Sequence, residues 1–191
     1  MRTTMAAALA ATLAMAGCGG ENDTDLGEME QDSLVEQPEE QAASATGARA
    51  TLVDREGRQV ATATLSQANG GVGLEVTATG IAAGEHGIHF HMVGQCDAAS
   101  GFESAGDHLN PTGAQHGLDN PNGPHMGDLP NVSIGADSTG TLTQATPIAV
   151  DSLFDADGSA LVIHAQRDDQ RTDPSGNSGD RIACGVIERG S

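Results

Sequence analysis

The sequence predicts an all-β domain, a Greek-key antiparallel eight-stranded β-sandwich or flattened barrel with long loops. Three observations lead to this fold class. Eight short segments carry alternating or β-branched apolar residues, clusters of Gly, Asn and Pro separate them, and no segment beyond the first 18 residues keeps a 3.6-residue apolar period. Many short strands without helices between them are typical of antiparallel sandwiches and barrels.

The expected strands lie at residues 50–53, 60–65, 72–77, 86–93, 131–134, 140–144, 160–165 and 182–187. With no Trp, no Tyr and three Phe among 191 residues, the core must be built from Val, Ile, Leu and Ala. Two long segments rich in Gly, Asn and Pro, 94–130 and 166–180, interrupt the strands. A stretch of more than about 30 residues without regular structure is uncommon in a compact domain unless something holds it in place.

The charge of the chain excludes several classes of function. The formal net charge is −19, and every cation is an arginine because the chain contains no lysine. From Gly47 onward, 18 acidic residues stand against seven arginines, a net charge of −11. Such a surface repels DNA, RNA and anionic lipid, so no nucleic-acid partner is expected, and an anionic substrate would need local attraction.

Residues 1–17 read as an export signal. One arginine precedes an apolar stretch, residues 5–16, that is too short to cross a membrane. The run Met15-Ala16-Gly17-Cys18 resembles the bacterial lipobox, in which the cysteine becomes the lipidated first residue, although that motif usually has Leu where Met15 stands. Lipidation of Cys18 would also explain an odd cysteine among three in an exported protein. The alternative is an ordinary cleaved signal followed by an incidental cysteine.

Residues 18–46 are expected to form the lipidated cysteine and an acidic, flexible linker. Nine acidic residues and no base lie between positions 19 and 46, with few large apolar residues to offset the entropy of ordering. A helix over residues 29–40 would have little to pack against. The sequence therefore predicts a folded domain at 47–191 that is exported to the bacterial cell envelope or periplasm and anchored to a membrane.

All seven histidines fall between residues 86 and 164, which is too clustered for dispersed surface residues. His89 and His91 are two residues apart in an expected strand, so both side chains share one face and could hold one metal, although such pairs are also common as plain strand residues. His164 ends a separate apolar strand. His86, taken alone, is better explained as a structural residue.

Three histidines and a carboxylate punctuate the long 94–130 loop: His108, His116, His125 and Asp128. Three imidazoles and a carboxylate suit tetrahedral zinc, whereas imidazole-rich tetragonal sites suit copper(II). Seven candidate ligands for two metals allow one histidine to be shared. The loop is therefore expected to be a metal-binding loop, held in place by its ion.

Residues 47–187 resemble the copper/zinc superoxide dismutases. The blocks that carry the resemblance keep the family's order and approximate spacing: GIHFH at 87–91, GDHLNP at 106–111, HG at 116–117, HMGDL at 125–129, VIHA at 162–165, DD at 168–169 and GNSGDRIACG at 176–185. The short segment before Arg181 is similar to that of the bacterial branch. The resemblance implies disproportionation of superoxide to oxygen and hydrogen peroxide, with copper cycling between Cu(II) and Cu(I) beside a structural zinc.

The resemblance also implies a ligand set. Copper would be held by His89, His91, His108 and His164, and zinc by His108, His116, His125 and Asp128. His108 would thus bridge the two metals, and in the family's mechanism it leaves reduced copper and carries a proton. Arg181 would offer a fixed cation and hydrogen-bond donors to the anion.

Other residues take supporting roles by the same resemblance. Asp168 would link a copper histidine to a zinc histidine and fix the orientation of both rings. Cys96 and Cys184 would form a disulfide. Because no lysine is present to guide an anion, Arg171 is assigned to steering, with a solvated surface charge as the alternative. The family's homodimer is an expectation that this sequence does not itself reveal.

Two other functions remain open on the sequence. An exported protein of the same fold could buffer copper without turnover, but the full ligand set and Arg181 argue against it. A surface lipoprotein with a zinc-pinned loop would leave His89, His91 and His164 unexplained. Metal content and superoxide decay measured on one sample would separate these functions.

Overall fold

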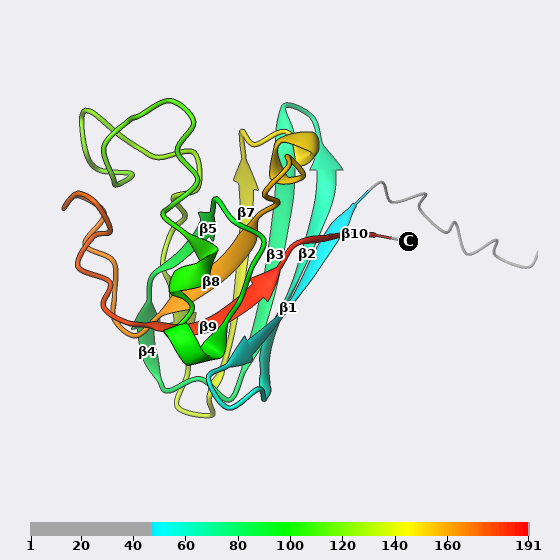
Figure 1. Cartoon of the computed structure of the whole chain (residues 1–191). Coiled ribbons are helices and arrows are strands. Elements are labelled where there is room, and N and C mark those ends of the chain that lie inside the picture. The colour runs from blue at the N-terminus through cyan, green and yellow to red at the C-terminus, as the bar shows by residue number, and fades with distance from the viewer. Residues whose placement is uncertain (1–46, 191) are drawn as a thin grey trace, which may run out of the picture. The chain divides into compact units, whose positions relative to one another are not determined.

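The computed structural model describes residues 47–190 as an array of β-strands joined by long loops (Figure 1). The strands are β1 (Ala48–Asp54), β2 (Gln59–Ala68), β3 (Gly71–Thr79), β4 (Gly84–His86), β5 (Ile88–His91), β6 (Val132–Ile134), β7 (Thr139–Thr146), β8 (Ala160–His164), β9 (Arg181–Val186) and β10 (Glu188–Arg189). Three short 3-10 helices accompany them, η1 (Ala98–Ser100), η2 (Glu103–Ala105) and η3 (Val150–Leu153). Within this part of the chain, no helix is long and apolar enough to cross a membrane.

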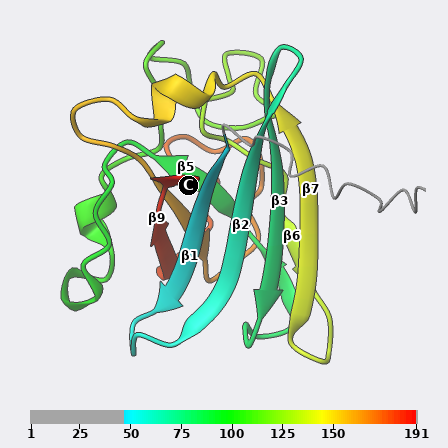
Figure 2. The same cartoon turned by 90° about the vertical axis from the view of Figure 1, so that its right-hand side faces the viewer.

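Eight of the strands form one curled antiparallel sheet in the order β5-β8-β9-β1-β2-β3-β7, with β10 paired to β1 (Figures 1 and 2). The other two, β4 and β6, form a separate two-stranded sheet. Neighbours such as β5 and β8, β9 and β1, or β3 and β7 are not consecutive in the chain, as in a Greek key. The chain runs from β4 into β5 and from β6 into β7, so the β4–β6 pair connects the two ends of the large sheet. The predicted flattened Greek-key barrel is confirmed.

The single strand expected at 86–93 is divided at Gly87. β4 pairs with β6, whereas β5 pairs with β8, so the chain changes partner at this glycine. A Cβ atom at Gly87 would lie 2.9 Å from the Cβ of Ser178 and 3.2 Å from that of Asp168. Glycine therefore lets the strand bend under the segment that carries Asp168.

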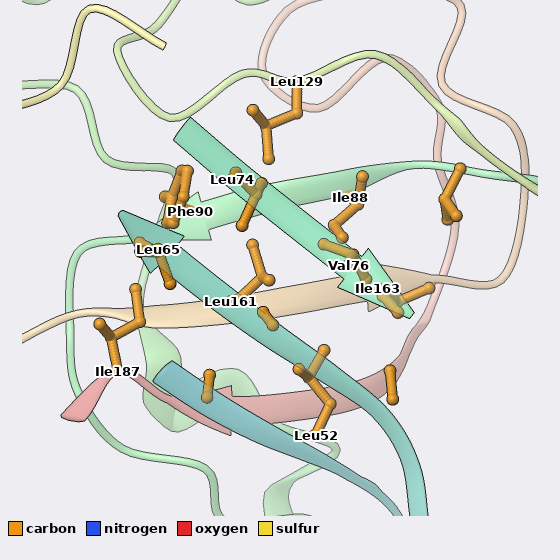
Figure 3. Packing of buried hydrophobic residues seen from close by; sticks show 14 of the residues in the cluster. Leu52, Leu65, Leu74, Val76, Ile88, Phe90, Leu129, Leu161, Ile163 and Ile187 are labelled. Carbon is orange, nitrogen blue, oxygen red and sulfur yellow. The ribbon is translucent and has the colours of Figure 1, made fainter. Parts of the chain in front are cut away.

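The core lies between the two halves of the curled sheet and is made of aliphatic side chains, as the composition predicts (Figure 3). Leu65 and Leu74 from β2 and β3 face Phe90 and Leu161 from β5 and β8 across the interior. Burial alternates along β1, β2 and β3, which present threonines and charged residues to solvent on their outer face.

β8 is buried on both faces, unlike β1 to β3. Leu161 and Ile163 belong to the main core, whereas Ala160 and Val162 pack with Phe102 in a second cluster on the opposite side of the sheet. This cluster also contains Cys184, which forms a disulfide with Cys96 across 88 residues of sequence, with the two Cα atoms 5.7 Å apart. The predicted disulfide therefore ties the start of the 94–130 loop to β9.

Candidate metal centre and active site

Two strands place three histidines on one side of the sheet. In β5, Ile88 and Phe90 point into the core, so His89 and His91 point to the opposite face. His164 ends β8, which pairs with β5, and it follows Ile163, which points into the core. All three imidazoles are buried, because the two long loops cover this face (Figure 1).

The 94–130 loop folds back along the free edge of β5. The Leu109 amide donates to the Phe90 carbonyl at 2.8 Å, and the Phe90 amide donates to the Gly127 carbonyl at 2.9 Å. A side chain at position 127 would collide with the Phe90 carbonyl, so this close approach requires Gly127. These bonds bring His108 and Asp128, which adjoin Leu109 and Gly127 in sequence, beside the strand histidines.

A first group of four imidazoles meets at this face: His89, His91, His108 and His164, with one nitrogen of each lying within 4.8 Å of the others. Four ring nitrogens of these residues are buried and lack any hydrogen-bond partner: Nδ1 of His89 and Nε2 of His91, His108 and His164. Buried polar atoms without partners are costly and rare in folded proteins. A metal ion bound by these four nitrogens would satisfy all of them, so the donor set fits copper.

The opposite nitrogens of the three strand histidines are held by fixed acceptors. His89 Nε2 donates to Asp168 Oδ2 at 2.7 Å, and His91 Nδ1 donates to the Gly106 carbonyl at 2.9 Å. His164 Nδ1 donates to the Gly179 carbonyl at 3.2 Å. Each bond places the proton on one nitrogen and leaves the lone pair on the other, facing the centre of the group.

A second group surrounds the Asp128 carboxylate. Asp128 Oδ1 lies 3.0 Å from Nδ1 of His108 and 3.0 Å from Nδ1 of His116. Its Oδ2 accepts hydrogen bonds from the Gly117 and His125 amides at 2.8 and 2.9 Å. Because His108 presents Nε2 to the first group and Nδ1 to the second, it lies between them as a bridging ligand would.

The composition of the second group differs in one member from the set expected from the sequence. The four residues with ligand atoms within 4.8 Å of one another are His89, His108, His116 and Asp128. His125 lies at the border of this group, with its Nδ1 3.4 Å from both Asp128 Oδ1 and His108 Nδ1. His89 enters because it packs on His108, with ring centroids 4.0 Å apart, although its Nε2 is occupied by Asp168.

Asp168 contacts one histidine of each group. Besides accepting from His89, its carboxylate lies 3.0 Å from His116 Nε2. Asn131 holds its backbone from both sides, because the Asp168 amide donates to Asn131 Oδ1 and Asn131 Nδ2 donates to the Asp168 carbonyl. A Cβ atom at Gly176 would overlap the Asp168 carboxylate, so the 166–180 loop needs glycine there.

The surroundings set the charge of the metal-free site. Burial lowers the pKa of His89 to about 4 and that of His164 to about 3, so both rings are neutral at neutral pH and can donate a lone pair. Burial by itself lowers the pKa of His116, but hydrogen bonds to Asp128 and Asp168 outweigh this effect and raise that pKa to about 9. For the carboxyls of Asp128 and Asp168, burial by itself raises the pKa. Hydrogen bonds to their histidine partners outweigh this effect and lower each pKa well below the usual range.

A cleft of about 560 Å³ opens onto the first group, and Arg181 lies in its wall with His108 and His164. The Arg181 side chain is only 13% exposed, and its Nη1 donates to the Phe102 carbonyl at 2.8 Å. Phe102 lies in the disulfide-tethered segment, so the Cys96–Cys184 bond also fixes the position of this guanidinium. The cleft gives an anion access to the first group beside a fixed cation.

Arg171 and His86 are placed apart from this cleft. Arg171 is 71% exposed and lies 3.9 Å from Asp119, and it does not line the cleft, so its steering role stays a prediction. His86 lies behind the site with Nδ1 2.8 Å from the His164 carbonyl and Nε2 3.0 Å from the Ala82 carbonyl, as expected of a structural residue. Cys18 lies outside the described residues.

Several contributors could not be named from the sequence. The Gly106, Gly179 and Phe102 carbonyls act through backbone atoms, which carry no residue-type signal. Asn131 ends an expected loop, and only its contact with Asp168 shows its role. Gly127 could have been suspected, because a glycine between His125 and Asp128 suggests a close backbone approach.

Comparison with known proteins gives the family. The model of copper/zinc superoxide dismutase (SODC) matches residues 59–187. The protein named superoxide dismutase [Cu-Zn] 2 of Aquifex aeolicus is 41% identical over 147 residues, which cover 73% of this chain and 85% of that protein. The superoxide dismutase-like protein YojM of Bacillus subtilis is 36% identical over 184 residues, covering 92% of this chain and 90% of that protein.

Solved structures that are similar to this chain indicate the same family. The Cu/Zn superoxide dismutase from Brucella abortus matches with a TM-score of 0.62 at 28% identity and covers 74% of this chain and 99% of its own. A SOD-like protein from Bacillus subtilis matches with a TM-score of 0.67 at 37% identity, covering 72% and 96%. The matched family model spans most of the described residues, including both histidine groups, and so this chain belongs to the copper/zinc superoxide dismutase family.

Proposed function

We propose that the chain disproportionates superoxide to oxygen and hydrogen peroxide, using one copper and one zinc. Copper is assigned to His89, His91, His108 and His164, and zinc to His108, His116, His125 and Asp128. The observation that carries this proposal is the convergence of four buried, unpartnered imidazole nitrogens at the end of an open cleft. When bound, copper would supply one-electron chemistry, in which one superoxide gives up an electron and becomes oxygen, and a second takes up that electron with two protons and becomes hydrogen peroxide.

The chain's own residues have three tasks in this reaction. Arg181 offers the incoming anion a cation whose position is fixed by the Phe102 carbonyl, so little reorganisation is needed on binding. His108 Nε2 faces the cleft group and can hold the proton that is delivered to the reduced substrate. Asp168 keeps the His89 and His116 rings in one orientation throughout.

The second group supports the choice of zinc. One carboxylate and three Nδ1 atoms, all on buried side chains, are typical of a structural zinc site. Zinc has no redox chemistry of its own. Metal bound by His116 and Asp128 would join two parts of the 94–130 loop, and its binding would therefore be coupled to the order of the loop.

Metal analysis tests these assignments. The purified full chain should contain one copper and one zinc, and a His116→Ala/Asp128→Ala variant should lose its zinc and gain proteolytic cuts in the 94–130 loop. An exposed Asp119→Asn/Asp137→Asn variant serves as the control and should keep both metals. Full zinc in the His116→Ala/Asp128→Ala variant would contradict the assignment.

We further propose that the protein is exported, lipidated on Cys18 and held at a bacterial membrane by the acidic linker 18–46. The support is the signal at residues 1–17 and the Met15–Cys18 run. A Cys18→Ser protein should leave the membrane fraction and keep its activity. Unchanged membrane association would contradict the lipid anchor. Sedimentation of the Cys18→Ser protein would also show whether it forms the homodimer suggested by the family resemblance.

A further inference from the structure

The cleft that leads to the first histidine group is acidic. The charged side chains that line it are Glu103, Asp107, Asp173, Asp180 and Arg181, four carboxylates against one guanidinium. Glu103 lies 3.6 Å from Arg181 Nη2 and partly offsets the only cation in the lining of the cleft. Asp180 lies 3.8 Å from Nη2 of Arg55, which does not line the cleft. The carboxylates oppose the entry of superoxide, so attraction of the substrate does not account for them.

The floor of the same cleft carries lone pairs that suit a cation. Nε2 of His108 and Nε2 of His164 are unpartnered, both side chains line the cleft, and their residues are 6% and 3% exposed. A neutral imidazole nitrogen without a proton binds a metal ion and offers nothing to an anion. Carboxylates along the walls and unpartnered imidazole nitrogens at the floor therefore suit the passage of a metal cation.

We propose that this cleft is the route by which copper enters its site, and that Glu103, Asp107 and Asp180 attract the ion to it. The inference rests on the proposed assignment of copper to the first group. These carboxylates act on the ion over about one Debye length, roughly 8 Å at physiological salt. The same charges therefore speed copper loading and slow superoxide entry. Asp173 is left out because its Oδ1 accepts from the His116 amide and orders the loop.

Met92 places a thioether side chain in the lining of this cleft. It follows His91 at the end of β5, lines the cleft, and is 45% exposed, unusual for a large apolar side chain among the described residues. A thioether is a soft ligand that favours Cu(I) over Cu(II). Met92 therefore gives Cu(I) an intermediate contact on the way to the histidines.

The rate of copper uptake tests the route. Zinc-loaded, copper-free full chain is mixed with Cu(II), and the absorption of the histidine-bound ion is followed by stopped flow. The cleft variant is Glu103→Gln/Asp107→Asn/Asp180→Asn. The control, Glu75→Gln/Asp151→Asn/Glu188→Gln, changes the charge equally with residues that do not line the cleft.

At low salt, the cleft variant should take up Cu(II) about fivefold more slowly than the control, because three nearby charges act on a divalent ion. After loading, it should consume superoxide about twofold faster, since the same charges act with opposite sign on a univalent anion. Both differences should shrink at high salt. Equal uptake rates in the cleft variant and the control would overturn the proposed route.

Two further measurements test the copper assignment of the site and the role of Met92 separately from the route. Copper content at saturation is determined on the same samples, and a wild-type chain that never binds one copper would overturn the assignment of the site itself. A Met92→Leu variant should take up Cu(I), supplied without oxygen, several-fold more slowly while its Cu(II) uptake is unchanged. Unchanged Cu(I) uptake would overturn the role of the thioether.

Discussion

At the scale of single residues, Arg181 shows how the fold turns a surface charge into a part of the site. Its guanidinium is nearly buried, donates to the Phe102 carbonyl and lies in the wall of the cleft that opens onto His108 and His164. Arg181→Ala should therefore slow superoxide decay by about tenfold or more and weaken its dependence on ionic strength, because both contact and field are lost. Pulse radiolysis across ionic strength measures both.

Two other arginines complete that experiment. Arg171→Ala tests steering and should lower the rate only at low salt, whereas Arg49→Ala, on an exposed part of β1, serves as the control and should leave the rate unchanged. An Arg181→Ala protein that keeps both the wild-type rate and the wild-type salt dependence would show that this guanidinium does not guide the anion.

The buried histidines predict how the metal-free protein responds to acid. The folded pKa of His89 is about 4 and that of His164 about 3, against 6.5 when unfolded, so the unfolded chain binds more protons below pH 6.5. The free energy of unfolding should therefore fall as the pH falls from about 6.5 toward 4. His116 acts in the opposite sense, because its raised pKa of about 9 stabilises the fold below 6.5 and this gain is lost as the pH rises through 9.

Urea unfolding of the metal-free chain at pH 7 and pH 5 measures the net effect of these histidines on the free energy of unfolding. The lowered pKa values of His91 and His108 act in the same direction as those of His89 and His164, so four groups outweigh one and the urea midpoint should be lower at pH 5. A midpoint that is higher at pH 5 than at pH 7 would contradict the burial of these rings in the neutral form.

At the scale of elements, the disulfide connects the loop that covers the site to the sheet. Cys96 and Cys184 close a long loop, and Phe102 and Val162 pack in the same cluster. A Cys96→Ala/Cys184→Ala variant should lose about 2–4 kcal/mol of unfolding free energy, and its urea midpoint should fall accordingly. Cys18→Ser is the matched control and should unfold like the wild type. A wild-type midpoint in the double variant would mean that the bond adds no stability.

The elements also show how far the sequence could predict the structure. Alternation identified every long strand, and the parity of His89 and His91 predicted their common face, because both follow from the two-residue period of a strand. The division at Gly87 was not predicted, because it depends on the approach of Ser178 and Asp168 from a distant loop. The presence of His89 in the second group likewise depends on distances between residues far apart in sequence.

At the scale of the whole molecule, the fold and the distribution of charge could be predicted to different extents. The strand pattern predicted the barrel and the family resemblance predicted the disulfide, and the fold confirms both. The net charge of the domain predicted that an anion would meet an unfavourable field. Which acidic residues line the cleft could not be predicted, because they come from three separate segments that only the fold brings together, at 103–107, 173 and 180.

The proposed reaction is the consumption of superoxide at the first histidine group of this acidic chain. Its most direct test is superoxide decay followed by pulse radiolysis on the full chain, with copper and zinc content determined on the same sample. We expect a decay rate proportional to the concentration of copper-loaded protein, lost when copper is removed and restored when it is added back. A chain that holds one copper and one zinc yet leaves superoxide decay at its spontaneous rate would contradict the account.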